Sequence, residues 1–386
     1  MLDEAKVRTR EFQKRLKDEG VDLAILTDES SIAYLAGFWG YLGIEFGRPT
    51  LLVIRPDAAP VVVTPLMETE MVTAMTWVED VRSWEDAGPN HWSAVLAKAI
   101  GDKARKEIWI EARSIPVLVR SAIEERWPGA TLRDVSPILG AQRMIKSPAE
   151  IAVMKQAGQI AAAMMDGAKG AMAAGVPEYE VALAVMNAGT RKAAGFLTTK
   201  GWDAFVSPMI HNLQIIQSGR DTSMVHRRAS VKKLEPGDPV YLCFCNMCQF
   251  KQYKLGFDRQ WFIEHVSDGA AHAQETAVKA QQTALKSMKA GVTAESVAAA
   301  ANAVYRDNGF SPGYRTGRSI GVAYLEAPEL KEGDKTVLRP GMTFAVDGGV
   351  TVEGKFGGRI GDSVVVTETG FDYITNYPRE LAVLKR

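Results

Sequence analysis

Two residue types in the second half of the chain are suited to moving protons or attacking a substrate. His226 lies in the polar segment 223–228, and an imidazole that titrates near neutral pH can carry a proton between water and a leaving nitrogen. Cys243 lies in residues 240–245, whose side chains alternate between the two faces of a strand. Its thiol is either a nucleophile with His226 as its base or a small buried hydrophobe. A lone histidine is often structural or solvated. For both His226 and Cys243, a catalytic and a structural role therefore stay open.

All three cysteines lie within residues 243–248. Residues this close cannot link distant parts of a fold, so the sequence excludes a disulfide framework and favours a reducing compartment. A closed zinc or iron–sulfur site needs a fourth ligand, usually from a second cysteine pair, and the sequence has no such pair. The cysteine run therefore does not predict a metal centre.

Arginines are the candidate residues for binding an acidic group. Arg48 follows Phe46 and a glycine in a loop. Its planar guanidinium matches a carboxylate through two hydrogen bonds, and the Phe46 ring could cover a flat substrate. Arg315 and Arg318 offer a second cation. On spacing alone, each of these arginines could equally be solvated or held in a structural ion pair.

The composition excludes two classes of partner. The 386 residues include 46 Lys and Arg against 46 Asp and Glu, so the net charge is zero. Nucleic acids and anionic membranes attract clustered excess positive charge, which is absent here. No window approaches 18 uncharged apolar residues, so no membrane-spanning helix is expected. The sequence predicts a soluble, cytoplasmic protein of two domains.

Residues 1–146 predict an α/β domain that alternates helices and strands. An amphipathic helix over 5–19 precedes a buried strand over 21–26, and residues 50–54 and 61–63 predict a hairpin. Further short strands are expected at 107–110 and 132–135.

A second domain is expected over residues 147–386. Ser147, Pro148 and Glu150 form the pattern of a capping box at a helix start. Met, Ala, Gly and Val of residues 172–176 recur at 288–292, an offset of 116 residues, and each passage opens a helix. The repetition predicts a domain of two similar halves with a cleft between them.

Four short segments of this second domain are the expected strands of the site. Polar side chains within strands need partners, so a site is expected where such strands meet. These strands are predicted at 240–245, 259–263, 342–346 and 363–366.

With these elements in place, the chain resembles the creatinase/aminopeptidase P family, whose fold is known as the pita-bread fold. The resemblance covers nearly the whole chain through short passages in a shared order. They are residues 46–49, 144–147, 176–183, Gly219 with His226, 237–238, 258–259, 314–316 and 340–342. The resemblance implies an α/β amino-terminal domain followed by an α+β pita-bread domain with an internal two-fold pseudo-repeat.

Most of this family holds two metal ions with two Asp, one His and two Glu, and the chain departs from that pattern. The first Asp position falls on Cys243 and the second near Lys254 or Asp258. The ligand His is replaced within residues 317–321, and the two Glu become Asp347 and Gly361. Divalent ions need several anionic oxygens, which arginine and glycine cannot supply. We therefore expect no metal and no cofactor.

The resemblance is greatest to the creatinase-like, metal-free branch. It implies that Phe46 and Arg48 bind a substrate carboxylate from the neighbouring subunit of a homodimer, and that His226 transfers a proton. It also implies that Asp258 and Glu326 hold a cationic nitrogen. A further group of substrate-binding candidates comprises Cys243, Arg315, Arg318, Glu329 and Asp347. Arg318 would supply fixed positive charge in place of a metal, or form an ion pair with Asp347 or Glu326.

The sequence thus predicts a metal-independent hydrolase of a non-peptide C–N bond in a small carboxylate-bearing amidine, guanidine or cyclic amide. It would act without nucleic-acid or membrane partners. Three alternatives stay open. They are a divergent metal-dependent Xaa-Pro peptidase, another lyase or hydrolase on the same fold, and a non-catalytic protein that binds a small acid.

Overall fold

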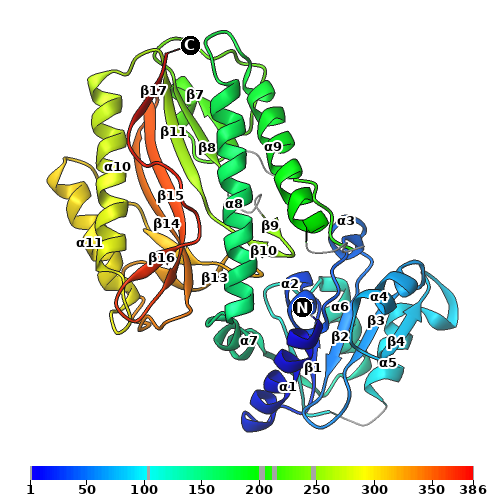
Figure 1. The fold of residues 1–386 in the computed structure, drawn as a ribbon. Helices are drawn as coiled ribbons and strands as arrows, with labels where there is room; N and C mark the ends of the chain where they lie inside the picture. Colours follow the sequence, from blue (N-terminus) through cyan, green and yellow to red (C-terminus); the bar gives the residue numbers. More distant parts are fainter. Residues whose placement is uncertain (1, 102–104, 200–204, 211–214, 245–248, 386) are drawn as a thin grey trace. The chain divides into compact units, whose positions relative to one another are not determined.

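The structure is a computed structural model that describes residues 2–101, 105–199, 205–210, 215–244 and 249–385 (Figure 1). The chain divides into two compact units, Met1–Gln142 and Arg143–Arg386. The sequence places the boundary slightly later, after residue 146, because its strongest local signal is the capping box at the next helix. None of the described helices is long and apolar enough to cross a membrane.

The first unit is built on a six-stranded sheet of order β4-β3-β2-β1-β5-β6. Its strands are β1 (Ala24–Leu26), β2 (Leu51–Ile54), β3 (Val61–Pro65), β4 (Asp80–Trp84), β5 (Glu107–Ile110) and β6 (Thr131–Asp134). The predicted hairpin is present as the antiparallel pair β2 and β3, whereas β1, β5 and β6 run parallel. Valine and isoleucine side chains of these strands form a buried core with helix α5 (Trp92–Ile100).

Helices and short 3-10 turns complete the first unit. The predicted amino-terminal helix is α1 (Leu2–Asp18), with Asp3 and Glu4 in its first turn, where acidic side chains favour a helix start. The others are α2 (Glu29–Ala36), α3 (Leu42–Phe46), η1 (Leu66–Glu68), α4 (Thr69–Met75), η2 (Gly88–Asn90), α5 (Trp92–Ile100), α6 (Val117–Arg126) and α7 (Ser136–Arg143), the last of which ends at the division between the units.

The second unit opens with the predicted capping box. Ser147 Oγ accepts from the Glu150 amide at 3.2 Å, and a Glu150 carboxylate oxygen accepts from the Ser147 amide at 2.8 Å. The box satisfies free amides at the start of α8 (Pro148–Ala171). The remaining helices are α9 (Glu178–Thr199), η3 (Gly219–Ser223), α10 (Asp268–Ser287) and α11 (Ala294–Asp307).

A nine-stranded sheet carries the second unit, with the order β13-β12-β14-β15-β11-β8-β7 and with β16 and β17 added to it. A separate hairpin pairs β9 with β10. The strands are β7 (Ile215–Ser218), β8 (Pro239–Cys243), β9 (Gln249–Phe250), β10 (Tyr253–Lys254), β11 (Asp258–Ile263), β12 (Gly317–Ser319), β13 (Glu326–Leu330), β14 (Thr343–Val352), β15 (Phe356–Val366), β16 (Phe371–Tyr373) and β17 (Ala382–Leu384).

The predicted pseudo-repeat is present in the backbone. Gly175 and Gly291 both take a positive φ, at 84° and 88°, in the turn before a helix. The Gly175 amide donates to the Leu234 carbonyl at 2.8 Å, and the Gly291 amide donates to the Leu338 carbonyl at 2.9 Å. Each half therefore repeats one unit, in which the turn between two helices is hydrogen-bonded to the segment that precedes β8 in one half and β14 in the other. This finding confirms the two-halves prediction.

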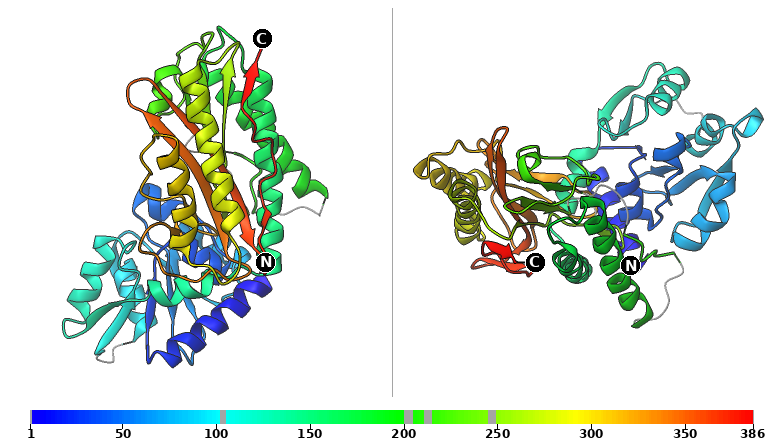
Figure 2. Two further views of the ribbon diagram at one scale, coloured as in Figure 1. Left: turned by 90° about the vertical axis from the view of Figure 1, so that its left-hand side faces the viewer. Right: turned by 90° about the horizontal axis from the view of Figure 1, so that it is seen from above.

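The two faces of the nine-stranded sheet differ. Helix α10 lies along β14 and β15 on one face (Figures 1 and 2), where a side chain at Gly348 or Gly358 would collide with its backbone. Gln281 of α10 donates to the Val346 carbonyl and to Asp362 on that face. Because side chains of a strand alternate, the residues between these positions point to the opposite face.

Candidate functional site

A row of residues crosses the face of the sheet opposite α10. The strand registers align Ile215 with Cys243, Cys243 with Asp258, Asp258 with Gly361, and Gly361 with Asp347. Aligned residues on neighbouring strands point to the same side. The row therefore brings together Cys243, Asp258 and Asp347, three of the predicted site residues, from β8, β11 and β14. We call this side of the sheet the polar face.

The absent side chain of Gly361 lets two carboxylates approach each other. A Cβ atom built at Gly361 would lie 2.8 Å from Asp258 Oδ2 and 2.9 Å from Asp347 Oδ1. The two carboxylates therefore approach the same point from opposite sides. Two negative charges this close disfavour each other, so the pair holds a proton or a cation more readily than either group alone.

Burial and, after it, the nearby charge of Asp347 raise the pKa of Asp258 from its usual value to about 7. The positive charge of Arg318 and a hydrogen bond from Tyr241 oppose the rise without cancelling it. Burial and the charge of Asp258 also raise the pKa of the Tyr241 hydroxyl well above its usual value. Asp258 is therefore a carboxyl group able to take up and release a proton near neutral pH.

Arg318 lies beside this pair and is almost fully buried. Its guanidinium forms an ion pair with Asp347 and lies over the Tyr324 ring at 4.4 Å from the centroid. A Cβ at Gly256 would come within 3.0 Å of Arg318 Nη2, so the glycine makes room for the guanidinium. Of the two ion-pair partners expected from the sequence, the structure places Arg318 against Asp347.

Several buried polar atoms on the polar face have no hydrogen-bond partner within the described part of the chain. Buried polar atoms are normally paired, so such a group marks a place where a polar ligand or water binds. Gln217, Tyr241 and Gln260 are aligned across β7, β8 and β11, and Arg359 lies two residues before Gly361 on β15. The atoms are Gln217 Oε1, Gln260 Oε1, Asp347 Oδ1 and Arg359 Nε.

The sequence did not identify four polar residues of this face as candidates, namely Gln217, Tyr241, Gln260 and Arg359. Their signal was present as polar side chains spaced two residues from a candidate on the same strand, as Gln260 is from Asp258. Only the strand registers show that these four share one face with the predicted residues.

His226 lies in the turn that follows η3, and its side chain is exposed. The carbonyl of the next residue, Arg227, accepts a hydrogen bond at 3.1 Å from Gln217, whose other side-chain atom is unpaired on the polar face. The turn therefore passes beside the polar face, but no hydrogen bond joins His226 to Asp258 or Asp347. Its predicted role in proton transfer stays a prediction.

Glu326 is paired with residues other than those of the polar face. One carboxylate oxygen accepts from Arg143 at 2.7 Å and from the Ala323 amide at 3.1 Å, and the other accepts from Lys146 at 2.8 Å. Although burial alone would raise the pKa of Glu326, the charges of Lys146 and Arg143 lower it to about 2. Glu326 therefore stays ionised and fastens residues 143–146 to β13.

We expect Glu326→Gln to lower the free energy of unfolding by about 3 kcal/mol at neutral pH. Because the pKa of Glu326 is depressed in the folded state, its stabilising effect is present above about pH 4.5 and is lost as the pH falls toward 2. Urea unfolding at pH 7 and at pH 3 measures this change. A loss of equal size at both pH values would contradict the proposed ion pair.

The other predicted cation of the second unit is also paired. Arg315 forms an ion pair with Glu329 at 2.5 Å, and Glu329 accepts from Lys331 as well. All three side chains are at least one-fifth exposed. The structure thus brings Arg315 and Glu329 together, but joins neither to Asp258.

Cys243 is buried, is disulfide-bonded and packs against Ile215 and Tyr241. A sulfur in a disulfide is not a nucleophile, because attack requires a thiolate. The structure therefore does not present Cys243 as the free thiol that a nucleophile requires, and its packing matches the alternative of a buried apolar residue. Cys245 and Cys248 lie outside the described residues.

Phe46 and Arg48 belong to the first unit. Phe46 ends α3 with its ring exposed, 6.2 Å from the ring of Tyr41. Arg48 Nη2 donates to Asp86 at 2.6 Å across a partly exposed ion pair. Arg48 thus already holds a carboxylate in this structure, which is the chemical group predicted for it.

The polar face does not suit a pair of divalent metal ions. Within the described residues, no three His, Cys, Asp or Glu side chains gather in a way that could hold a metal. Arg318 forms an ion pair with Asp347, so Asp258, Asp347 and Arg318 together carry a net charge of −1, which offsets a monovalent group but not two divalent ions. Asp258 and Asp347 remain as the only carboxylates of the aligned row, and two such groups do not supply the oxygens that two ions need.

Comparison with known proteins places the chain in a family. Residues 152–368 match metallopeptidase family M24, and residues 8–145 match the creatinase/prolidase N-terminal domain. The chain belongs to family M24. This finding confirms the family predicted from the sequence, including the pita-bread fold of its second unit.

The relatives of this M24 protein are hydrolases of several kinds, together with a cyclase. It is 28% identical to agropine synthesis cyclase of Rhizobium rhizogenes, with 96% of this chain and 95% of the relative aligned. It is 27% identical to creatinase of a Bacillus species, with 96% and 89% aligned. Among solved structures, prolidase from Thermococcus sibiricus superposes with a TM-score of 0.85 at 24% identity over 98% and 99% of the two chains. The last similarity shows the fold alone.

Proposed function

We propose that this M24 protein is a metal-independent hydrolase of a non-peptide C–N bond. Its substrate would be a small molecule with a carboxylate and an amidine, a guanidine or a cyclic amide. The observation that carries the proposal is the pair of carboxylates, Asp258 and Asp347, that approach each other over Gly361 beside the buried guanidinium of Arg318.

The carboxylates beside Gly361 suit a group that donates hydrogen bonds from nitrogen. Asp347 Oδ1 and Gln260 Oε1 are acceptors without partners among the described residues, and both lie on the polar face. An amidinium or guanidinium has planar N–H groups that would satisfy such acceptors and offset the repulsion between the two carboxylates. Arg359 Nε, a donor without a described partner, would meet a carbonyl or carboxylate oxygen of the same molecule.

Asp258 is the proposed proton-transfer group. In its ionised form it takes a proton from water as the water oxygen bonds to the substrate carbon. It then returns the proton to the nitrogen as the C–N bond breaks. Positive charge from Arg318 and Arg359 stabilises the negative charge that develops on the substrate during attack. His226 is proposed as a second proton carrier, on the strength of the family resemblance and of its turn beside Gln217.

The carboxylate of the substrate is assigned to Arg48 and the flat face of the substrate to Phe46, contributed by the second subunit of a homodimer. The resemblance to creatinases supports this assignment, as does the carboxylate that Arg48 already holds from Asp86. Sedimentation velocity tests the dimer, and full activity in a monomer would exclude a shared site.

We expect Asp86→Ala to lower the KM of the substrate by about 2–5-fold, because the variant removes a carboxylate that competes for Arg48. Arg48→Ala should raise KM instead. Steady-state kinetics on both variants measure the effect, and Asp57→Ala, which breaks a similar exposed ion pair with Lys17, is the control. A higher KM in Asp86→Ala would show that Arg48 needs Asp86 to hold its position.

A cyclase activity is a second candidate, favoured by the similarity to agropine synthesis cyclase. Closing a cyclic amide is the reverse of its hydrolysis, so the same acid–base groups would serve both directions. The direction would depend on whether water or an internal nitrogen reaches the carbonyl carbon.

The deciding experiment is an NMR-monitored incubation of chelator-treated protein with guanidino acids, cyclic amidines, lactam acids, open-chain amino acids that could cyclise, and Xaa-Pro dipeptides. Asp258→Asn and His226→Ala are the control enzymes. Turnover of one C–N substrate that survives chelation and is lost in Asp258→Asn supports the proposal. Dipeptide cleavage that needs added metal would show a divergent peptidase, and binding without turnover would show a small-acid-binding protein.

A further inference from the structure

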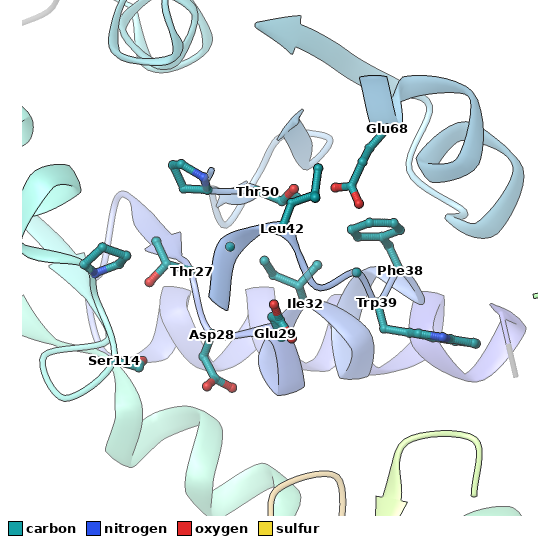
Figure 3. Close-up of a pocket in the computed structure, with 14 residues that line it drawn as sticks. Thr27, Asp28, Glu29, Ile32, Phe38, Trp39, Leu42, Thr50, Glu68 and Ser114 are labelled. Carbon is teal, nitrogen blue, oxygen red and sulfur yellow. The ribbon is translucent and has the colours of Figure 1, made fainter. Parts of the chain in front are cut away.

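A cavity in the first unit has a lining that none of the roles described above explains. Its volume is about 240 Å³. Its walls come from the start of α2, the segment 38–43, residues 49–50, and two short stretches near Glu68 and Ser114 (Figure 3). All of these residues lie within the stretch that matches the creatinase/prolidase N-terminal domain, and none belongs to the polar face.

The described charged residues that line this cavity are all acidic. Among the described lining residues three are acidic, Asp28, Glu29 and Glu68, and none is a lysine, arginine or histidine. Asp28 is partly engaged, because its carboxylate accepts from the Ser31 amide at the start of α2. An excess of negative charge in a concave site attracts and concentrates cations.

Glu68 is the residue that points to a ligand. It is only 6% exposed, and within the described chain its carboxylate has no hydrogen bond or ion pair. Figure 3 shows this carboxylate directed toward the cavity beside the Phe38 ring. Burial raises the pKa of Glu68, as expected for a carboxylate without a counter-charge. A buried, unpaired acid is costly unless something else pairs with it.

The remaining walls favour an organic cation over a metal ion. Phe38, Trp39, Ile32 and Leu42 give the cavity aromatic and aliphatic surfaces. Aromatic faces attract ammonium and guanidinium groups, and aliphatic walls accommodate a carbon stem. Thr27 Oγ1 is buried without a partner in the described structure and supplies a further hydrogen-bonding atom. The described residues also include no cluster suited to a metal.

We infer that this cavity is a binding site for a small organic cation, an ammonium or guanidinium group on a short aliphatic stem. Glu68 is its counter-charge, and Phe38 and Trp39 are its aromatic walls. The site is separate from the proposed hydrolase site and does not depend on that proposal.

Isothermal titration calorimetry with n-butylammonium and n-propylguanidinium tests the site on the full chain. We expect binding of at least one cation at concentrations up to about 10 mM, and much weaker binding of the neutral analogues n-butanol and n-propylurea. Glu68→Gln should weaken cation binding by about 10- to 100-fold, because it removes a charge-assisted hydrogen bond. Glu70→Gln is the matched control, since Glu70 is exposed on α4 and does not line the cavity.

A second pair of variants separates this site from the polar face. Asp347→Asn should leave cation binding to the cavity unchanged, whereas Thr27→Val should weaken it by about 3- to 10-fold. Thr27→Val also replaces Glu68→Gln as the test if circular dichroism shows that Glu68→Gln does not fold. The inference is overturned if no cation binds, if n-butanol binds as tightly as n-butylammonium, or if neither cavity variant changes the affinity.

Discussion

Asp258→Asn is expected to make the protein more stable at pH 8 and at the same time to abolish turnover. Burial and the charge of Asp347 raise the pKa of Asp258 from 3.8 to about 7. The folded state therefore binds the Asp258 proton more tightly than the unfolded chain does. This contribution to stability is complete below about pH 4 and is lost as the pH rises through 7. Asparagine cannot ionise, so the variant avoids the loss.

Urea unfolding at two pH values measures this effect without a known substrate. The stability gained by Asp258→Asn should be larger at pH 8 than at pH 5 by about 2–3 kcal/mol. Asp362→Asn is the matched control on the other face of the same sheet. Asp362 forms ion pairs with Arg259 at 2.8 Å and Arg379 at 2.9 Å. Removing this buried partner should cost about 3–5 kcal/mol at pH 8.

The same variant reports on catalysis. If Asp258 takes the proton from water, kcat/KM of the wild type rises with pH through about 7, and Asp258→Asn loses at least about 100-fold in turnover. An equal change in stability at pH 5 and pH 8 would show that Asp258 is ionised in both conditions. Turnover that persists in the variant would move the proton-transfer role to His226.

Much of the fold could be predicted because its signals are local. The capping box at Ser147 is complete within four residues, and the turns at Gly175 and Gly291 repeat the same residue types. The hairpin over β2 and β3 follows from two apolar runs around a turn. Such features are set by neighbouring residues and do not depend on distant packing.

The site could be predicted only in part, because it depends on strand register. The family resemblance singled out Asp258, Arg318 and Asp347, which the structure brings to one face. Gln217, Gln260 and Arg359 joined them only when the alignment of five strands was known. The ion pairs of Glu326 could not be predicted either, because its partners Arg143 and Lys146 are about 180 residues earlier in the chain. The cavity at Glu68 depends in the same way on contacts between distant segments.

The relatives of the chain divide between enzymes named as Xaa-Pro peptidases and enzymes named for non-peptide substrates. Overall identity does not separate these two groups, since both match at 24–28%. The charges on the polar face bear on the choice more directly, because the guanidinium of Arg318 already pairs with Asp347 there, and a shared fold does not by itself fix the reaction.

Arg318→Gln is expected to damage both stability and turnover, because it leaves the half-buried Asp347 carboxylate without its cation. We expect a loss of about 2–3 kcal/mol in the free energy of unfolding at pH 8. The loss should be smaller at pH 5, where the pair Asp258 and Asp347 can take up a proton to offset the missing charge. Because Arg318 lowers the pKa of Asp258, the carboxylate pair of the variant should hold its proton to a higher pH.

Two further variants show whether the charge or the planar shape of Arg318 is responsible for its effects on stability and turnover. Arg318→Lys keeps the charge but cannot stack its plane on the Tyr324 ring, which lies 4.4 Å from the guanidinium carbon, so it should recover part of the stability and little of the turnover. Arg315→Gln breaks the more exposed ion pair with Glu329 and should cost less than about 1 kcal/mol. If Arg318→Gln lowered the free energy of unfolding as little as Arg315→Gln does, Asp347 would not need a cation. The polar face could then accept a metal at that carboxylate, and the metal-independent mechanism would lose its structural basis.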